Sequence, residues 1–184
     1  MSSLAYKQEI EKRSLALFAK YHTIVTIDPG GTTGVCVVTN IKYAIPLEFV
    51  TSLVSLKSDN YNWLQFIDKL DTLDSFLQGD DRTVLVITEN YRERLRTAIA
   101  TSGKENLPER ILGAMTYISY KNKFDVMSVE PSTHKGNRSD LKLESILDYF
   151  GLKINTEHEK DAVSLLLYGL GNENKIKKAF MLPE

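Results

Sequence analysis

The stretch TIVTIDPGGTTGVCVV, residues 23–38, decides the fold. An apolar, β-branched run leads to Asp28, and a Pro-Gly-Gly-Thr-Thr-Gly turn then leads into a second β-rich run. We therefore expect residues 23–28 and 34–40 to form two strands of a hairpin. Taken alone, an Asp before Pro-Gly is most often a turn former. Its position at the end of a buried strand nevertheless makes Asp28 the first candidate for a functional residue.

Length and composition predict one globular domain. The chain has 184 residues, of which 42% are hydrophobic and 26% are charged, as is ordinary for a soluble protein. A net charge of −1 gives no general attraction to nucleic acid or membranes. The single cysteine, Cys36, excludes a disulfide framework and a cysteine-rich zinc site. Neither a membrane-spanning run nor a signal-peptide pattern is evident, so we expect a cytoplasmic protein.

The rest of the chain alternates predicted helices and strands. A weakly amphipathic helix is expected over residues 3–21, and a third extended run over 43–56. The later elements follow in this order: a helix at 61–77, a strand at 83–88, a helix at 108–122, a strand at 124–129, a loop at 131–139, and helices at 140–150 and 159–170. This order predicts an α/β fold with a mixed sheet, whose first strands form an antiparallel meander and whose later strands are connected through helices.

Three carboxylates fall where such a sheet can bring them together. Asp28 ends the first strand, Glu89 follows the strand VLVIT, and Asp161 lies early in the last apolar helix. If the first and fourth strands are parallel neighbours, Asp28 and Glu89 leave the same sheet edge side by side. A helix packed across that edge then brings Asp161 to both. His158 lies three residues before Asp161, on the same helical face.

A cluster of this kind indicates a metal site. Neighbouring carboxylates raise each other's pKa, which makes the cluster unfavourable without a counter-charge. Mg²⁺ takes oxygen ligands and keeps positions for water and phosphate, and two such ions about 3.5–4 Å apart can drive phosphodiester hydrolysis. Separately, Glu89 reads as a solvated residue after a strand, and His158 and Asp161 as residues at a helix start. Their joint placement is what favours a metal site.

The segments IDPGGTTG, VITENYR and HEKDA, in this order, resemble the RuvC-like branch of the RNase H-like nuclease superfamily. They are most similar to the RuvC-like Holliday junction resolvases of bacteriophages. The resemblance covers about residues 23–171 and implies an RNase H-like fold with a five-stranded sheet. It divides the chain into an N-terminal helical extension, residues 1–22, and a nuclease domain, residues 23–184.

The resemblance also implies the composition of the catalytic site. Asp28, Glu89 and Asp161 are expected to bind two Mg²⁺ or Mn²⁺ ions. His158 occupies the first position of the family's terminal acidic pair, where it would bind metal or position the attacking water.

The three glycines of the turn have two explanations. Gly30, Gly31 and Gly34 allow a tight return of the chain and keep bulk away from an approaching phosphate backbone. Alternatively, they serve only the hairpin turn.

Contacts with the substrate are expected from local positive charge. Residues 57–91 hold three basic and seven acidic residues, whereas residues 92–142 hold ten basic and six acidic residues. Seven residues of the second segment are candidates for phosphate contacts: Arg92, Arg94, Arg96, Lys104, Lys135, Arg138 and Lys142. The alternative for each is a solvated surface charge. Compared with the bacterial resolvases, the lysine-rich motif after Pro131 is shortened to PSTHKGNRSDLK.

The function implied by the resemblance is resolution of four-way (Holliday) junctions by an endodeoxyribonuclease. Paired symmetric nicks in branched DNA require a C₂ homodimer. No nucleotide cofactor is expected. If a phage encodes the chain, the expected location is the host cytoplasm. Two alternatives remain: an RNase H-like nuclease for other branched DNA, flaps or RNA-containing substrates, and a non-catalytic junction-binding module. The turn DPGGTTG also resembles that of actin-like ATPases and sugar kinases, but their second phosphate motif and second domain are missing here.

Overall fold

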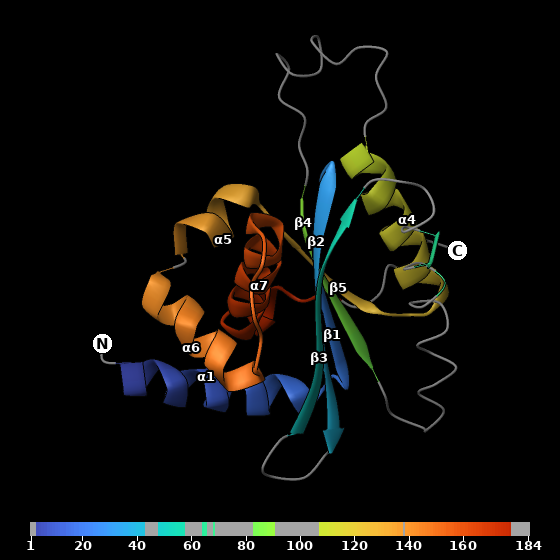
Figure 1. The fold of residues 1–184 in the computed structure, drawn as a ribbon. Coiled ribbons are helices and arrows are strands. Elements are labelled where there is room, and N and C mark those ends of the chain that lie inside the picture. Colours follow the sequence, from blue (N-terminus) through green and yellow to red (C-terminus); the bar gives the residue numbers. More distant parts are fainter. Residues whose placement is uncertain are drawn as a thin grey trace.

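The fold is built around a mixed sheet with helices on both faces (Figure 1). The computed structural model describes residues 3–42, 48–57, 83–90, 107–137 and 139–177, together with residues 64, 65 and 68. Within these residues the sheet has five strands in the order β3-β2-β1-β4-β5. Their bounds are β1 Thr23–Asp28, β2 Thr32–Lys42, β3 Glu48–Lys57, β4 Val84–Glu89 and β5 Asp125–Val129.

The strand directions confirm the predicted mixed sheet. The strand β2 pairs antiparallel with both β1 and β3. For β1 and β2 this direction follows from the short turn that joins them. The strand β4 pairs parallel with both β1 and β5. A parallel pair requires a crossover between its strands, and the helix α4 (Leu107–Lys121) supplies it between β4 and β5.

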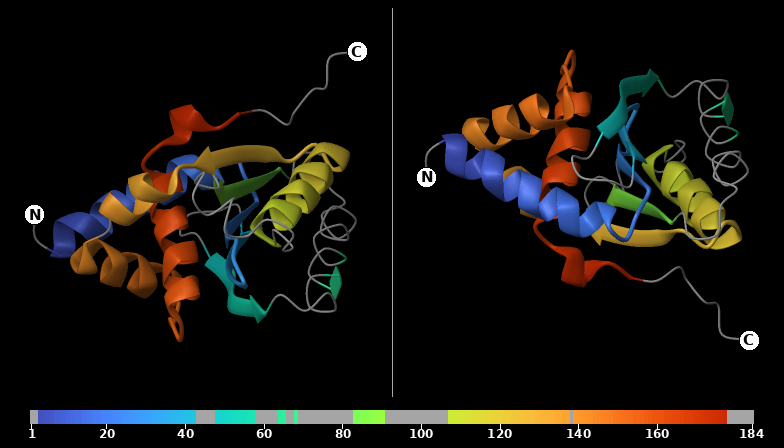
Figure 2. Two further views of the ribbon diagram at one scale, coloured as in Figure 1. Left: turned by 90° about the horizontal axis from the view of Figure 1, so that it is seen from above. Right: turned by 90° about the horizontal axis from the view of Figure 1, so that it is seen from below.

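The helices lie in layers on either side of the sheet. Figure 2 shows α4 on one face and α7 (Glu157–Leu170) on the other, with α1 (Ser3–Phe18) and α6 (Asp140–Phe150) outside α7. The predicted helix at 61–77 lies almost entirely outside the described residues. No helix in the described ranges is both long and apolar enough to cross a membrane.

The predicted loop at 131–139 is wrong, because most of it forms the short helix α5 (Pro131–Asn137). Proline is favourable at the first position of a helix, where its missing N–H would have no helical partner in any case. A segment that reads as a proline-containing loop therefore begins a helix, which places its side chains beside α7.

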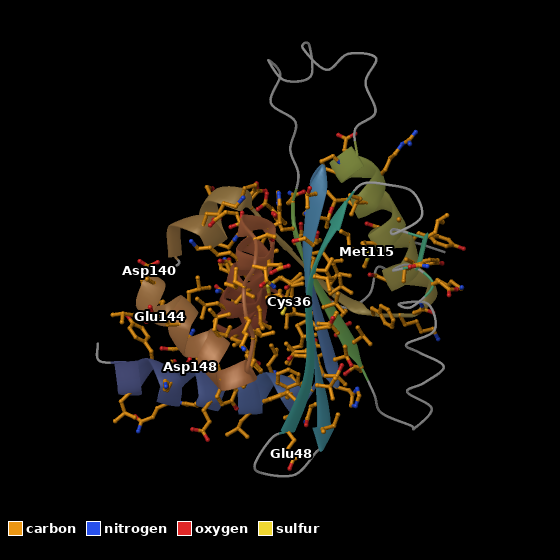
Figure 3. All side chains as sticks on the ribbon, viewed as in Figure 1. Cys36, Glu48, Met115, Asp140, Glu144 and Asp148 are labelled. Carbon is orange, nitrogen blue, oxygen red and sulfur yellow. The ribbon has the colours of Figure 1, made fainter. Side chains whose placement is uncertain are left out.

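The adjacent strands β1 and β4 are buried on both faces, and successive residues along each strand face the two different cores. Ile24 and Leu85 pack with α7 and the outer helices, whereas Val25 and Val86 pack with α4. Figure 3 labels one residue from each core, Cys36 on the α7 side and Met115 on the α4 side. This two-residue period determines which face each strand-end side chain reaches.

The N-terminal helix contributes to the core on the α7 side. Ile10, Leu17 and Phe18 of α1 are buried in that core, and α1 packs along α6. The extra N-terminal helix expected from the sequence is therefore present. The division of the chain after residue 22 stays a prediction.

Candidate active site

Asp28 and Glu89 end adjacent parallel strands and point to the same face. The register pairs Ile27 with Thr88, so the next residue on each strand is one of the two carboxylates. By the two-residue period, both side chains belong to the face covered by α7. Both are nearly buried, with side-chain exposures of 9% and 10%. The sequence-based expectation that these two strand ends lie side by side is confirmed.

Hydrogen bonds to the sheet fix the position of α7 above these carboxylates. The Ser55 hydroxyl of β3 lies 2.6 Å from the Thr156 hydroxyl, which caps the helix, and 3.3 Å from Glu159 Oε1. Closer to the site, the Thr26 hydroxyl of β1 donates to the Ala162 carbonyl at 2.7 Å. Because Glu159 and Thr26 are both buried, these bonds are shielded from water and hold the first turns of α7 in place.

The glycine turn meets α7 directly at one position. A Cβ on Gly34 would collide with the backbone carbonyl of His158, so only glycine permits this approach of helix to strand. A Cβ on Gly30 would lie 2.9 Å from the Thr32 carbonyl, whereas Gly31 has open space. None of the three has φ in the left-handed region. Gly34 thus serves helix packing, which is neither of the two explanations expected from the sequence. A role in leaving room for phosphate stays a prediction.

The close approach of α7 brings His158 and Asp161 to the strand ends. His158 Nδ1 lies 3.5 Å from Asp28 Oδ2. Lys135 of α5 connects the other two carboxylates, with Nζ 3.3 Å from Glu89 Oε2 and 3.1 Å from Asp161 Oδ2. The four predicted catalytic residues and Lys135 therefore form one cluster, to which β1, β4, α5 and α7 each contribute.

Sequence reasoning missed one member of this cluster, His134. Its Nε2 lies 2.6 Å from Glu89 Oε2, and its side chain is fully buried. Its Nδ1 has no hydrogen-bond partner among the described residues. The Asn90 side chain anchors the start of α5 by donating to Glu130 at 3.0 Å. The signal for this site was Pro131 followed five residues later by glycine and asparagine, a start and stop pattern for a short helix.

The surroundings shift the pKa values of the two strand-end carboxylates in opposite directions. Burial raises the pKa of Asp28 to about 6, with further contributions from the negative charges of Glu89 and Asp161. Burial also raises the pKa of Glu89, but its hydrogen bond with His134 and the charge of Lys135 outweigh this and hold the pKa below its ordinary value. Glu89 therefore already has counter-charges, whereas Asp28 is short of positive charge.

The donor set fits a divalent cation. The Lys135 ammonium already lies between the carboxylates of Glu89 and Asp161, so the cluster accommodates positive charge at that position. Carboxylate oxygens are the ligands that Mg²⁺ and Mn²⁺ favour. Within the described part of the chain, no group of three His, Cys, Asp or Glu side chains is placed to hold a metal ion. Asp28, Glu89, Asp161 and His158 are the residues that would close around an ion.

The predicted DNA-binding residues separate into three groups. Lys135 lies inside the carboxylate cluster. Lys142 lies on α6 with its Nζ 5.9 Å from the ring centroid of Tyr6, and it lines a cleft of about 540 Å³ that α1 and α7 border. The others lie outside the described residues: Arg92, Arg94, Arg96, Lys104 and Arg138.

Comparison with known proteins adds evidence on the fold. No family model and no curated protein sequence matches the chain. Among solved structures, T. thermophilus RuvC in complex with a Holliday junction substrate matches with a TM-score of 0.56 and 15% identity, over 85% of this chain and 99% of that chain. The yeast mitochondrial Holliday junction resolvase Ydc2 matches with a TM-score of 0.41 and 11% identity, over 92% of this chain and 91% of that chain. The sheet order, the helix layers and the likeness to T. thermophilus RuvC together show that the chain has an RNase H-like fold.

Proposed function

We propose that this chain is a metal-dependent DNA endonuclease that resolves four-way junctions by paired symmetric nicks. The observation that carries the proposal is the meeting of Asp28 and Glu89 at adjacent strand ends beneath Asp161 and His158 of α7. The likeness in fold to a RuvC solved with a Holliday junction supports the choice of branched DNA as substrate.

The residues of the site divide the catalytic work between them. Asp28, Glu89 and Asp161 would hold Mg²⁺ or Mn²⁺, two ions per site, and His158 would bind metal or orient the attacking water. A bound divalent ion supplies Lewis-acid stabilisation of the phosphate and lowers the pKa of water. His134 fixes the orientation of Glu89, and the hydrogen bonds between α7 and the sheet hold Asp161 in line with the strand ends. In many enzymes, stabilisation of the transition state by preorganised charges supplies the largest part of the rate enhancement.

The substrate determines the proposed assembly. Two symmetric cuts in a four-way junction require two sites related by a two-fold axis, so we propose a C₂ homodimer. Each cut would leave a 5′-phosphate and a 3′-hydroxyl. The setting would be the cytoplasm, and for the bacteriophage type of resolvase it would be that of the host cell.

The function is tested by cleavage of labelled four-way junction, three-way junction, flap, linear duplex and RNA–DNA hybrid with Mg²⁺, Mn²⁺ or EDTA. We expect paired nicks at symmetric positions of the four-way junction, abolished by EDTA. Equal cutting of flaps or hybrids would replace resolution by a broader nuclease activity. Tight junction binding without any cutting would make the chain a binding module.

Neutral variants of the carboxylates test the assignment of the site. Asp28→Asn, Glu89→Gln and Asp161→Asn should each lower the cleavage rate by about 100-fold or more and leave junction binding intact. The matched control is Glu144→Gln, which removes an exposed acid on α6, facing away from the sheet (Figure 3). The control should cleave at the wild-type rate. Wild-type cleavage by all three site variants would overturn the assignment.

A further inference from the structure

Lys135 places a positive charge between two carboxylates that come from different elements. Its Nζ is 3.1 Å from Asp161 Oδ2 on α7 and 3.3 Å from Glu89 Oε2 on β4. A lysine is protonated at neutral pH, and two carboxylate oxygens at these distances favour its charged form. The side chain is therefore a cation, and it joins β4 to α7 across the candidate active site.

The ammonium and a divalent cation would compete for the same oxygens. A Mg²⁺ ion binds carboxylate oxygens at about 2.0–2.1 Å, which leaves no space for an ammonium between the same two groups. The Lys135 side chain is 41% exposed and has a flexible four-carbon stem, so its head can move to solvent without unfolding α5. His134, buried one residue earlier, keeps its bond to Glu89 while this happens.

We propose that the Lys135 ammonium is an internal counterion of the metal-free site and that a divalent cation displaces it. The inference rests on the proposed function for the metal ion, and it gives Lys135 a role that precedes contact with DNA. Without metal, the ammonium offsets the repulsion between Glu89 and Asp161. After displacement, the freed ammonium lies at the mouth of the site, where a DNA phosphate can pair with it.

The first test is Mn²⁺ affinity without DNA, measured by calorimetry and by the electron paramagnetic resonance signal of free Mn²⁺. Lys135→Met removes the competing cation and should bind Mn²⁺ about tenfold more tightly than wild type. Lys135→Arg keeps the charge and should show no gain. The matched control is Lys12→Met, at an exposed position of α1, and it should match wild type. Unchanged or weaker Mn²⁺ binding by Lys135→Met overturns the proposal.

The second test is thermal unfolding with EDTA and with saturating Mn²⁺. In EDTA, Lys135→Met leaves the carboxylates without their counter-charge, and its Tm should fall by about 2–4 °C. In Mn²⁺ the difference from wild type should disappear, because the ion replaces the ammonium in both proteins. Lys135→Gln serves as a second neutral variant. A Tm deficit of equal size in both conditions would mean that Lys135 has only a structural role, and it would contradict the exchange.

The Mn²⁺ affinity and thermal unfolding measurements use no DNA, so their results do not depend on whether the protein cleaves junctions. A protein that exchanges Lys135 for Mn²⁺ but cuts no substrate contradicts the proposed function and leaves this inference standing. A protein that cuts four-way junctions, but whose Lys135→Met variant has wild-type Mn²⁺ affinity, gives the opposite result.

Discussion

Asp28 and Glu89 end neighbouring strands with nearly equal exposure, yet their pKa values move in opposite directions. Burial acts on both, so the difference comes from α5, which gives Glu89 both His134 and Lys135. Asp28 has only the more distant, half-exposed His158 as a direct partner among the described residues. At the scale of single residues, ionised Asp28 is the least compensated charge of the cluster.

The raised pKa of Asp28 predicts how stability depends on pH in metal-free protein. Its folded-state pKa of about 6 exceeds the ordinary value of 3.8, so between these values the folded state binds more protons than the unfolded state. The Asp28 contribution to the free energy of unfolding therefore decreases as pH rises from about 4 to 6, by about 3 kcal/mol at most. Asp28→Asn lacks this contribution. It should equal wild type near pH 4 and be more stable above pH 6.

Urea unfolding of both proteins at pH 4, 5, 6 and 7 in EDTA measures this difference. Comparing the two proteins removes the pH dependence of groups that do not interact with Asp28. Added Mn²⁺ should stabilise wild type at pH 7 more than Asp28→Asn, because the proposed function makes the Asp28 carboxylate a metal ligand. A variant less stable than wild type at pH 7 in EDTA would show that ionised Asp28 is well compensated.

At the scale of elements, the sequence could predict what depends on local periodicity. Asp28 and Glu89 follow runs of strand-forming residues, and the two-residue period puts both on one face. The placement of His158 and Asp161 on one face of α7 could be predicted from their separation of three residues. The place of α5 depends instead on Pro131 starting a helix and on the contact of Asn90 with Glu130 across the sheet edge. Such a contact between distant parts of the chain leaves no periodic signal, so His134 was missed.

The contact of β2 with α7 predicts unequal effects for two glycines of one turn. Gly34→Ala forces a Cβ against the His158 carbonyl, and backbone must move to relieve it. We expect a loss of about 1–3 kcal/mol in the free energy of unfolding, with a loss of cleavage because His158 and Asp161 move with the helix. Gly31→Ala meets no atom within 4 Å and should change stability by less than about 0.5 kcal/mol.

Denaturant unfolding and junction cleavage of both variants give the comparison. Equal destabilisation by Gly31→Ala would assign the glycines to the hairpin turn alone. Wild-type stability of Gly34→Ala with lost junction binding would instead favour the role of leaving room for phosphate.

At the scale of the whole molecule, α1 connects β3 and α6 on the side of the sheet that α7 covers. Phe18 of α1 packs against Phe49 of β3, with ring centroids 4.9 Å apart, and Phe49 packs against Phe150 of α6 at 4.8 Å. The same core contains Ala162, Leu165 and Leu166 of α7. The helix that carries Asp161 is thus supported from behind by α6 and α1.

This packing predicts that α1 is required for folding and that it acts at a distance from the chemistry. Phe18 is 1% exposed, and its replacement by Ala should cost about 3–5 kcal/mol in the free energy of unfolding. Leu4, on the same helix but 66% exposed, is the matched control, and Leu4→Ala should change stability by less than about 0.5 kcal/mol. Urea unfolding measures both. At a temperature where Phe18→Ala stays folded, its cleavage rate should equal that of wild type, because Phe18 does not contact the carboxylates. Equal stability of the two variants would mean that residues 1–22 are an accessory extension and that the core of the fold is complete without them.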